Sequence, residues 1–191
     1  MQNLFPKPLL VSFIGFPGSG KTYFSTRLAK KIHAITLNSD ALRLNMFGSL
    51  EKIEQIRNSE NRSRLYDDVF GAMNYAAAQA LQAGHSVVYD AQMAKRIDRA
   101  RMEALVKENG ARFVLVWLQT DPSVAKQRGA KRKQAADSHR YTGEKIHMLV
   151  EGFATTTEVP DEQEFVVAIN GELPFTQQYD IFHTALSANR V

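Results

Sequence analysis

The chain has 191 residues, which suits one domain built around one sizeable hydrophobic core. It contains no cysteine, which excludes disulfide bonds, thiolate metal sites and a cysteine nucleophile. The formal net charge of +4 suits an anionic ligand but does not by itself indicate nucleic-acid binding. The sequence has no apolar run of membrane-span length and no recognisable signal peptide, so we expect no membrane contact and a cytoplasmic location.

Apolar residues follow two alternating patterns along the chain. Short apolar runs predict five strands, at about residues 9–14, 34–37, 86–90, 113–118 and 165–169. Apolar residues at helical spacing predict helices at about residues 23–32, 39–47, 50–57, 59–83, 95–108, 121–133, 143–153 and 175–189. Strands that alternate with helices indicate an α/β fold with a five-stranded, mainly parallel sheet and helices on both faces.

A glycine-rich loop separates the first predicted strand from the first predicted helix. It fits the phosphate-binding template G-x-x-x-x-G-K-[ST] at every fixed position. Its residues are Gly15, Phe16, Pro17, Gly18, Ser19, Gly20, Lys21 and Thr22. Glycines let the backbone curl until successive N–H groups point at one anion, and the following helix adds its positive N-terminal end. Lys21 can reach the β- and γ-phosphates of a nucleotide, and the Thr22 hydroxyl can bind Mg²⁺.

Two carboxylates follow strands that we expect near this loop. Ligands of open parallel sheets bind at the carboxyl ends of the strands, so the loop, Asp40 and Asp90 should converge. Asp40 is placed to accept a proton from an acceptor hydroxyl, and Arg43 should share its helix face and contact the acceptor or the transferring phosphate. Asp90 occupies the position expected for a carboxylate that holds Mg²⁺, directly or through water. The alternatives are a helix N-terminal carboxylate, a solvated arginine and an ordinary turn residue, respectively.

A basic stretch follows the fourth predicted strand. Most of its lysines are expected on a solvated helix face. Arg128 and Arg132 lie one helical turn apart, where both could turn toward one anion when a lid at about residues 122–142 closes. Closure would also expel water, which competes as a phosphate acceptor. We therefore predict that one of these arginines contacts phosphate.

In this order and spacing, the motifs resemble those of the small P-loop kinases. The closest groups are the polynucleotide 5′-hydroxyl kinases and the zeta-toxin-like ATP-binding proteins, with gluconate and shikimate kinases more distant. The resemblance runs from the first predicted strand into the fifth. It is carried by the glycine loop, Asn38-Ser39-Asp40-x-x-Arg43, Val87-Val88-Tyr89-Asp90-Ala91, and Asp121-Pro122 with Arg128 and Arg132.

The resemblance implies a P-loop NTPase fold with a helical lid, one kinase domain over residues 1–191, and transfer of the γ-phosphate of Mg·ATP to a hydroxyl. Its implied catalytic residues are Lys21, Asp40, Arg43, Arg128 and Arg132, with Asp40 as general base. It also implies that the adenine pocket lies near residues 170–171. Related chains often read Asp-Ala-Thr-Asn after the third strand, whereas this one reads Asp90-Ala91-Gln92-Met93. The acceptor therefore stays open between a small molecule, a nucleotide sugar and a nucleic-acid 5′-hydroxyl.

A second class of function also stays open: an ATP-binding and ATP-hydrolysing switch that acts on a protein partner. A GTPase would normally carry an Asn-Lys-x-Asp guanine reader, and the sequence contains none, so guanine specificity is disfavoured. An Asp40–Arg43 pair beside the phosphates favours an acceptor other than bare water. The sequence thus predicts a phosphotransferase with an alcohol group as acceptor.

Overall fold

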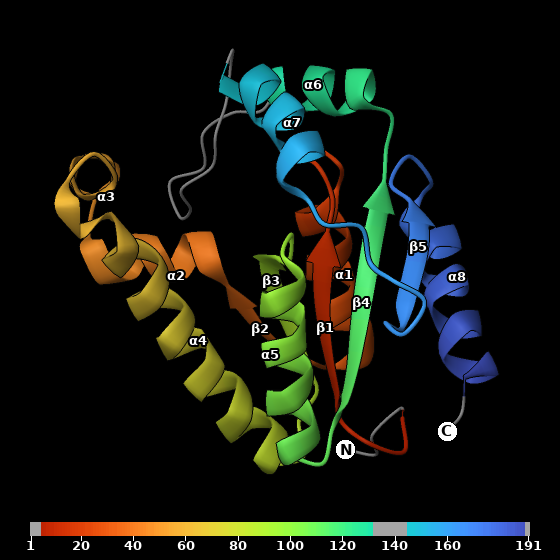
Figure 1. Cartoon of the computed structure of the whole chain (residues 1–191). Coiled ribbons are helices and arrows are strands. Elements are labelled where there is room, and N and C mark those ends of the chain that lie inside the picture. Colours follow the sequence, from red (N-terminus) through yellow and green to blue (C-terminus); the bar gives the residue numbers. More distant parts are fainter. Residues whose placement is uncertain (1–4, 132–144, 190–191) are drawn as a thin grey trace.

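The computed structural model describes residues 5–131 and 145–189. Its centre is a parallel sheet with the strand order β2–β3–β1–β4–β5 (Figure 1). The strands are β1 Leu9–Ile14, β2 Ile35–Asn38, β3 Val87–Gln92, β4 Arg112–Gln119 and β5 Val166–Asn170. Every neighbouring pair in the sheet is parallel, so the predicted five-stranded sheet is confirmed.

Helices cover both faces of this sheet. Their bounds are α1 Lys21–Ile32, α2 Ser39–Phe47, α3 Leu50–Arg57, α4 Arg64–Gln82, α5 Arg96–Glu108, α6 Pro122–Ala130, α7 Lys145–Thr156 and α8 Phe175–Ala188. One core joins α1 and α8 to the sheet, and a second joins α4 and α5 to its opposite face (Figure 1). Side chains of β1 enter these two cores alternately: Val11 and Phe13 enter the first, and Leu10 and Ile14 the second.

The long helix predicted at about residues 59–83 differs from the structure at its start. Residues Glu60–Ser63 form a short 3₁₀ helix, and α4 begins after it at Arg64. The cause is local, because the Ser59 hydroxyl accepts a hydrogen bond from the N–H of Asn61 at 3.2 Å and so stabilises a tighter turn. No helix within the described residues is both long and apolar enough to cross a membrane.

The predicted lid at about residues 122–142 is described only in part. α6 forms its first segment, and most of the remainder lies outside the described residues. α6 packs against α7 through Ala125, Ile146 and Val150, and the half-buried Phe16 of the glycine loop joins this cluster. Two helices and the loop thus meet above the carboxyl end of β1.

Candidate active site

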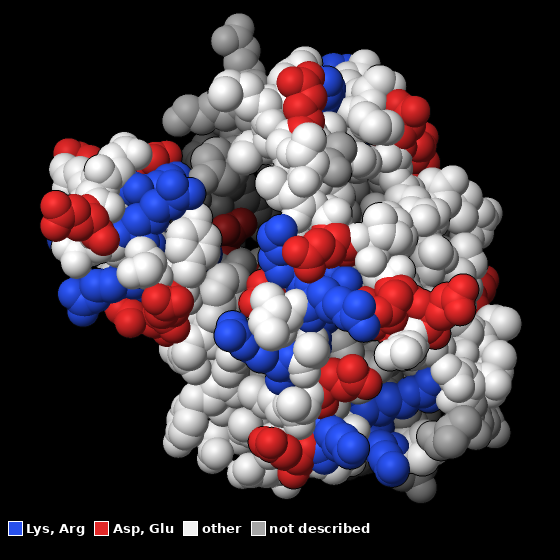
Figure 2. Space-filling view, viewed as in Figure 1, with Lys and Arg blue, Asp and Glu red and all other residues white. Residues whose placement is uncertain are grey.

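A cavity of about 650 Å³ lies at the carboxyl ends of the strands. Its described walls come from the glycine loop, α2, α3, α4, the end of β3, the start of α5 and α7. In the space-filling view a hollow opens between the α3 side and the α7 side of the molecule (Figure 2). The fold therefore brings the loop and the segments after β2 and β3 to one open cavity, as expected for an open parallel sheet.

The glycine loop takes a shape that residues with a Cβ would disturb. Gly18 has φ 92°, in the left-handed region, and a Cβ there would collide with the carbonyl oxygen of Ala125 in α6. The loop ends at Gly20, directly before α1, so the positive end of that helix faces the cavity. The Lys21 ammonium group donates to the carbonyl oxygens of Gly15 and Phe16, the latter at 2.9 Å. The backbone of the loop and Lys21 thus line the same cavity.

Asp90, at the end of β3, is buried and held by two neutral donors. Its Oδ2 accepts hydrogen bonds from the Ser25 hydroxyl at 3.0 Å and from the Asn38 amide at 2.8 Å. Thr22 lines the same cavity as Asp90. One hydroxyl and one carboxylate form a donor set that fits Mg²⁺, which usually takes its other ligands from water and substrate phosphates. Thr22 and Asp90 are therefore the residues that would hold this ion.

Asp40 and Arg43 lie together on α2 at the cavity wall. Arg43 Nη1 and Asp40 Oδ1 are 2.9 Å apart, and the Arg43 side chain is buried. The carbonyl oxygen of the Asn38 side chain accepts from the N–H of Ala41 at 2.8 Å and so caps the helix that carries both residues. Asn38 thus contacts Asp90 through its amide nitrogen and fixes α2 through its amide oxygen.

Comparison with known families gives a match over residues 10–153 to AAA_33, described as an AAA domain. The chain belongs to the AAA_33 family. The matched region contains the glycine loop, Asp40, Arg43 and Asp90. Comparison with curated protein sequences gives no match.

Three solved structures resemble this AAA_33 chain over nearly its whole length. A sugar kinase from Janibacter sp. HTCC2649 has a TM-score of 0.64 at 19% identity, over 95% of this chain and 94% of the other. A gluconokinase from Sinorhizobium meliloti 1021 has a TM-score of 0.63 at 21% identity, over 96% and 93%. The APS kinase of Mycobacterium tuberculosis, in complex with AMPPNP and APS, has a TM-score of 0.60 at 19% identity, over 96% and 99%. The AAA_33 chain therefore has the α/β fold of the P-loop kinases.

The structure describes one of the two predicted lid arginines, Arg128. Arg128, on α6, donates to the carbonyl oxygen of Gly171 at 2.9 Å and is not among the described residues that line the cavity. Gly171 in turn lies against the glycine loop, where a Cβ would collide with the carbonyl oxygen of Ser19. Arg132 lies outside the described residues. A phosphate contact by either arginine stays a prediction.

The cavity also contains residues to which the sequence analysis gave no role. Arg57, Tyr66 and Phe70 line it from α3 and α4, and Gln92, noted only as a departure from related chains, lines it from the end of β3. Tyr66 and Phe70 are spaced four residues apart, which puts them on one face of α4. The four-residue spacing was the only sequence signal for these two cavity residues, and aromatic residues that pack in a core show the same spacing. Ser25, one turn after Thr22 in α1, gave no sequence signal for its contact with Asp90.

A buried arginine fixes the backbone next to the cavity. Arg99, at the start of α5, pairs with both carboxylate oxygens of Glu164, at 3.0 Å for Oε2. It also donates to the carbonyl oxygens of Met93, Ala94 and Glu158 at 3.1–3.2 Å. Burial alone would raise the pKa of Glu164, but hydrogen bonds from Arg99 and from the N–H of Asp161 more than offset burial and lower it. Arg99 thus joins the turn after β3 to the segment between α7 and β5.

Proposed function

We propose that the protein is an ATP-dependent kinase that transfers the γ-phosphate of Mg·ATP to a hydroxyl acceptor. The observation that carries this proposal is that the phosphate-binding loop, the Asp40–Arg43 pair and Asp90 line one cavity. Phosphoryl transfer needs a held donor, neutralised charge and an acceptor oxygen placed in line with the γ-phosphorus. The cavity contains residues suited to each of these requirements.

The chemical step assigns a role to each side chain. Backbone N–H groups of the loop and Lys21 bind the β- and γ-phosphates. Mg²⁺, when held by Thr22 and Asp90, would neutralise charge on the phosphate oxygens. The acceptor oxygen forms a bond to the γ-phosphorus while the bond from that phosphorus to the β,γ-bridging oxygen breaks and its electron pair leaves with ADP. Asp40 takes the hydroxyl proton, and Arg43 orients the Asp40 carboxylate.

The solved structures support a phosphotransferase. Those described above are named a sugar kinase, a gluconokinase and an APS kinase, and the last contains AMPPNP and APS. Their names differ in the acceptor, so the acceptor of this chain has to be inferred from its own cavity. We also propose, from the motifs, the narrower kinship with polynucleotide 5′-hydroxyl kinases and zeta-toxin-like proteins, one domain over residues 1–191, and a lid at about residues 122–142 that brings Arg128 or Arg132 to the phosphates.

The decisive experiment follows labelled γ-phosphate from Mg·ATP to a mixed panel of hydroxyl acceptors. We expect label on one acceptor class with the wild type, and a loss of transfer by about two to four orders of magnitude with Asp40→Asn, which removes the base. Lys21→Ala should weaken ATP binding and transfer together. Thermal melts would establish that both variants fold.

The contrary outcome supports the alternative, an ATP-hydrolysing switch that acts on a protein partner. Such a switch would release the label only as inorganic phosphate, at the same rate in the wild type and Asp40→Asn. Tight Mg·ATP binding and full turnover by Lys21→Ala would reject the nucleotide site itself.

A further inference from the structure

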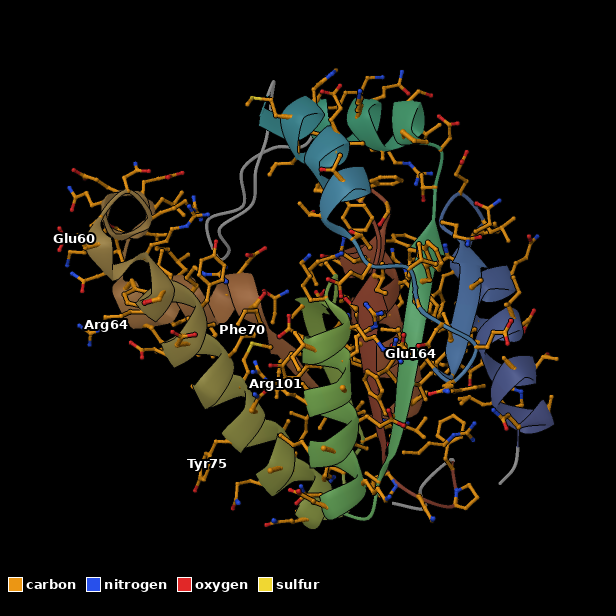
Figure 3. All side chains as sticks on the ribbon, in the orientation of Figure 1. Glu60, Arg64, Phe70, Tyr75, Arg101 and Glu164 are labelled. Carbon is orange, nitrogen blue, oxygen red and sulfur yellow. The ribbon has the colours of Figure 1, made fainter. Side chains whose placement is uncertain are left out.

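The acceptor side of the cavity has an aromatic wall. Tyr66 and Phe70 line it from α4. Figure 3 shows Phe70 on the inner side of α4, whereas Tyr75 projects from the outer side into solvent, where it is 70% exposed. Phe153 of α7 lines the cavity too, and its ring centroid is 4.8 Å from that of Phe16 in the glycine loop. A ligand next to the phosphates would therefore lie against aromatic side chains, which favour a ring with an apolar face.

The arginines of this wall are already paired with carboxylates. Arg43 pairs with Asp40, and Arg57 Nη1 lies 2.9 Å from Glu54 Oε1. Both arginine side chains are largely shielded from solvent, with 8% and 15% exposed. In such surroundings an ion pair acts as a nearly neutral unit, and separating it exposes an unpaired charge.

Charges over the described cavity wall are balanced. Its basic residues are Lys21, Arg43 and Arg57, and its acidic residues are Asp40, Asp90 and Asp98. Bound Mg·ATP adds net negative charge to this balanced set. A phosphate or carboxylate on the acceptor would then lie near like charges, with no surplus of cations on the described wall to compensate. The charge balance therefore favours an uncharged acceptor.

The amide of Gln92 offers hydrogen bonds that the described protein does not use. Gln92 lines the cavity, and its Nε2 and Oε1 are both buried with no hydrogen-bond partner among the described residues. Buried polar groups are normally paired, so this amide has reason to turn toward a ligand. A carboxamide offers one donor side and one acceptor side, which two neighbouring hydroxyl groups match.

We propose that the acceptor is an uncharged, polyhydroxylated ring. Its apolar face lies on Tyr66 and Phe70, two neighbouring hydroxyls bind the Gln92 amide, and a further hydroxyl faces Asp40 and the γ-phosphate. This inference rests on the proposed kinase function. The same chemistry occurs in a free sugar or cyclitol and in the ribose of a nucleoside, and the test separates these sources.

The test compares acceptors as matched pairs that differ in one anionic group. Suitable pairs are a hexose and its sugar acid, a cyclitol and its monophosphate, and a nucleoside and its 3′-monophosphate. We expect the uncharged member of one pair to have a kcat/KM at least about tenfold higher, because the anionic member adds like charge. The pair that responds identifies the source. Preference for the anionic member, or for a 5′-hydroxyl oligonucleotide, would overturn the inference while leaving the kinase proposal intact. Label on no acceptor would reject the kinase proposal instead.

Variants of the wall give an independent readout. Gln92→Leu keeps the side-chain volume close but removes the amide, so it should raise the KM for the acceptor roughly tenfold while the KM for ATP stays the same. Tyr66→Leu should raise the acceptor KM roughly fivefold. The matched control is Tyr75→Leu, on the same helix but facing solvent. An acceptor KM that Gln92→Leu leaves unchanged, in a variant that melts like the wild type, would remove Gln92 from the site.

Discussion

At the scale of a single side chain, Asn38 links the two carboxylates of the candidate site, Asp90 and Asp40. Its amide nitrogen donates to Asp90, and its amide oxygen caps the helix that carries Asp40. Ser25 donates to the same Asp90 oxygen. Both donors bind Oδ2, and no other side chain or N–H of the described residues donates to the Asp90 carboxylate, so we expect Oδ1 to bind the proposed metal ion or its water. One asparagine thereby sets the position of the proposed metal ligand relative to the proposed base.

Asn38→Asp separates these two contributions. The new carboxylate keeps an oxygen for the helix cap but replaces the donor to Asp90 with a like charge. Loss of a hydrogen bond to a metal ligand commonly lowers metal affinity about 10–100-fold. We therefore expect the Mg²⁺ concentration for half-maximal transfer to rise by about that factor. Titration of phosphate transfer with Mg²⁺ measures this rise. Asn45→Asp, on the exposed side of α2, is the control, and an equal Mg²⁺ requirement in both variants would contradict the role of Asp90.

At the scale of an element, ion pairs and hydrogen bonds to carboxylates hold the segment between α7 and β5 in place. Besides the Arg99–Glu164 pair, Glu158 accepts from the N–H of Arg96 at 2.7 Å and pairs with Lys95 at 3.1 Å. These contacts, led by the Arg96 N–H, lower the pKa of Glu158. The turn after β3 contacts the same segment, since the N–H of Glu158 donates to the carbonyl oxygen of Ala94 at 2.9 Å. Polar contacts, rather than an apolar core, therefore fix this border of the cavity.

Lowering the pH should weaken the Arg99–Glu164 pair that holds this segment. A carboxylate whose pKa is lowered by folding contributes stability above its unfolded pKa, and that contribution is lost as the pH falls through the lowered native value. For Glu164 the ordinary value is 4.5, so the loss should occur below about that pH. Glu164→Gln should be less stable than the wild type at pH 7, and its Tm should fall less between pH 6 and pH 3.5. Melting curves across this range check the prediction, with the exposed Glu162→Gln as control. Parallel pH profiles for Glu164→Gln and wild type would refute it.

Two glycines in different elements should respond to alanine with opposite signs. Gly71 lies in the interior of α4 and a Cβ added there would meet open space, so Gly71→Ala should stabilise the protein by up to about 1 kcal/mol. Gly18→Ala introduces both left-handed strain and a collision with α6, so it should lower the Tm and weaken ATP binding. Melts with and without Mg·ATP measure both effects. A Gly18→Ala protein with unchanged ATP affinity would show that the loop backbone can move away from α6.

Local signals predicted most elements well. α3 matches the predicted residues 50–57 because Gly48 ends the preceding helix and Ser49 caps the next. The 3₁₀ turn at Glu60–Ser63 escaped prediction because hydrogen bonding at Ser59 overrides helical periodicity there. Periodicity reports which face is apolar, and it does not report the geometry of individual hydrogen bonds.

The candidate site was predictable where a residue type has a fixed place in a motif. The sequence singled out the glycine loop, Asp40, Arg43 and Asp90, and the fold brings them to one cavity. Gln92 drew notice only as a departure from related chains, because the lack of a partner for its amide is a tertiary property. Arg99 contacts residues that lie up to 65 positions away in the chain, and a single sequence gives no sign of such contacts.

At the scale of the whole molecule, the strand order puts β1 between partners from much later in the chain. Leu10 is aligned with Val87 of β3 on one side and with Phe113 of β4 on the other. Both β3 and β4 must therefore be present before the centre of the sheet around β1 is complete. The edges are the short strand β2 and β5, and a short edge strand limits pairing with other molecules.

This order has a consequence during synthesis. The apolar run Leu9–Ile14 is synthesised before both of its partner strands, which lie more than 70 residues later in the chain. Until β4 arrives, one edge of β1 stays unpaired, and such an edge is a template for aggregation. A fragment of residues 1–110 should therefore collect in the pellet on centrifugation, whereas the full chain stays in the supernatant. The strand that carries the phosphate loop is thus made before both of its partners and is paired on both edges only after β4 has been made, so its folding should depend on chaperones until then.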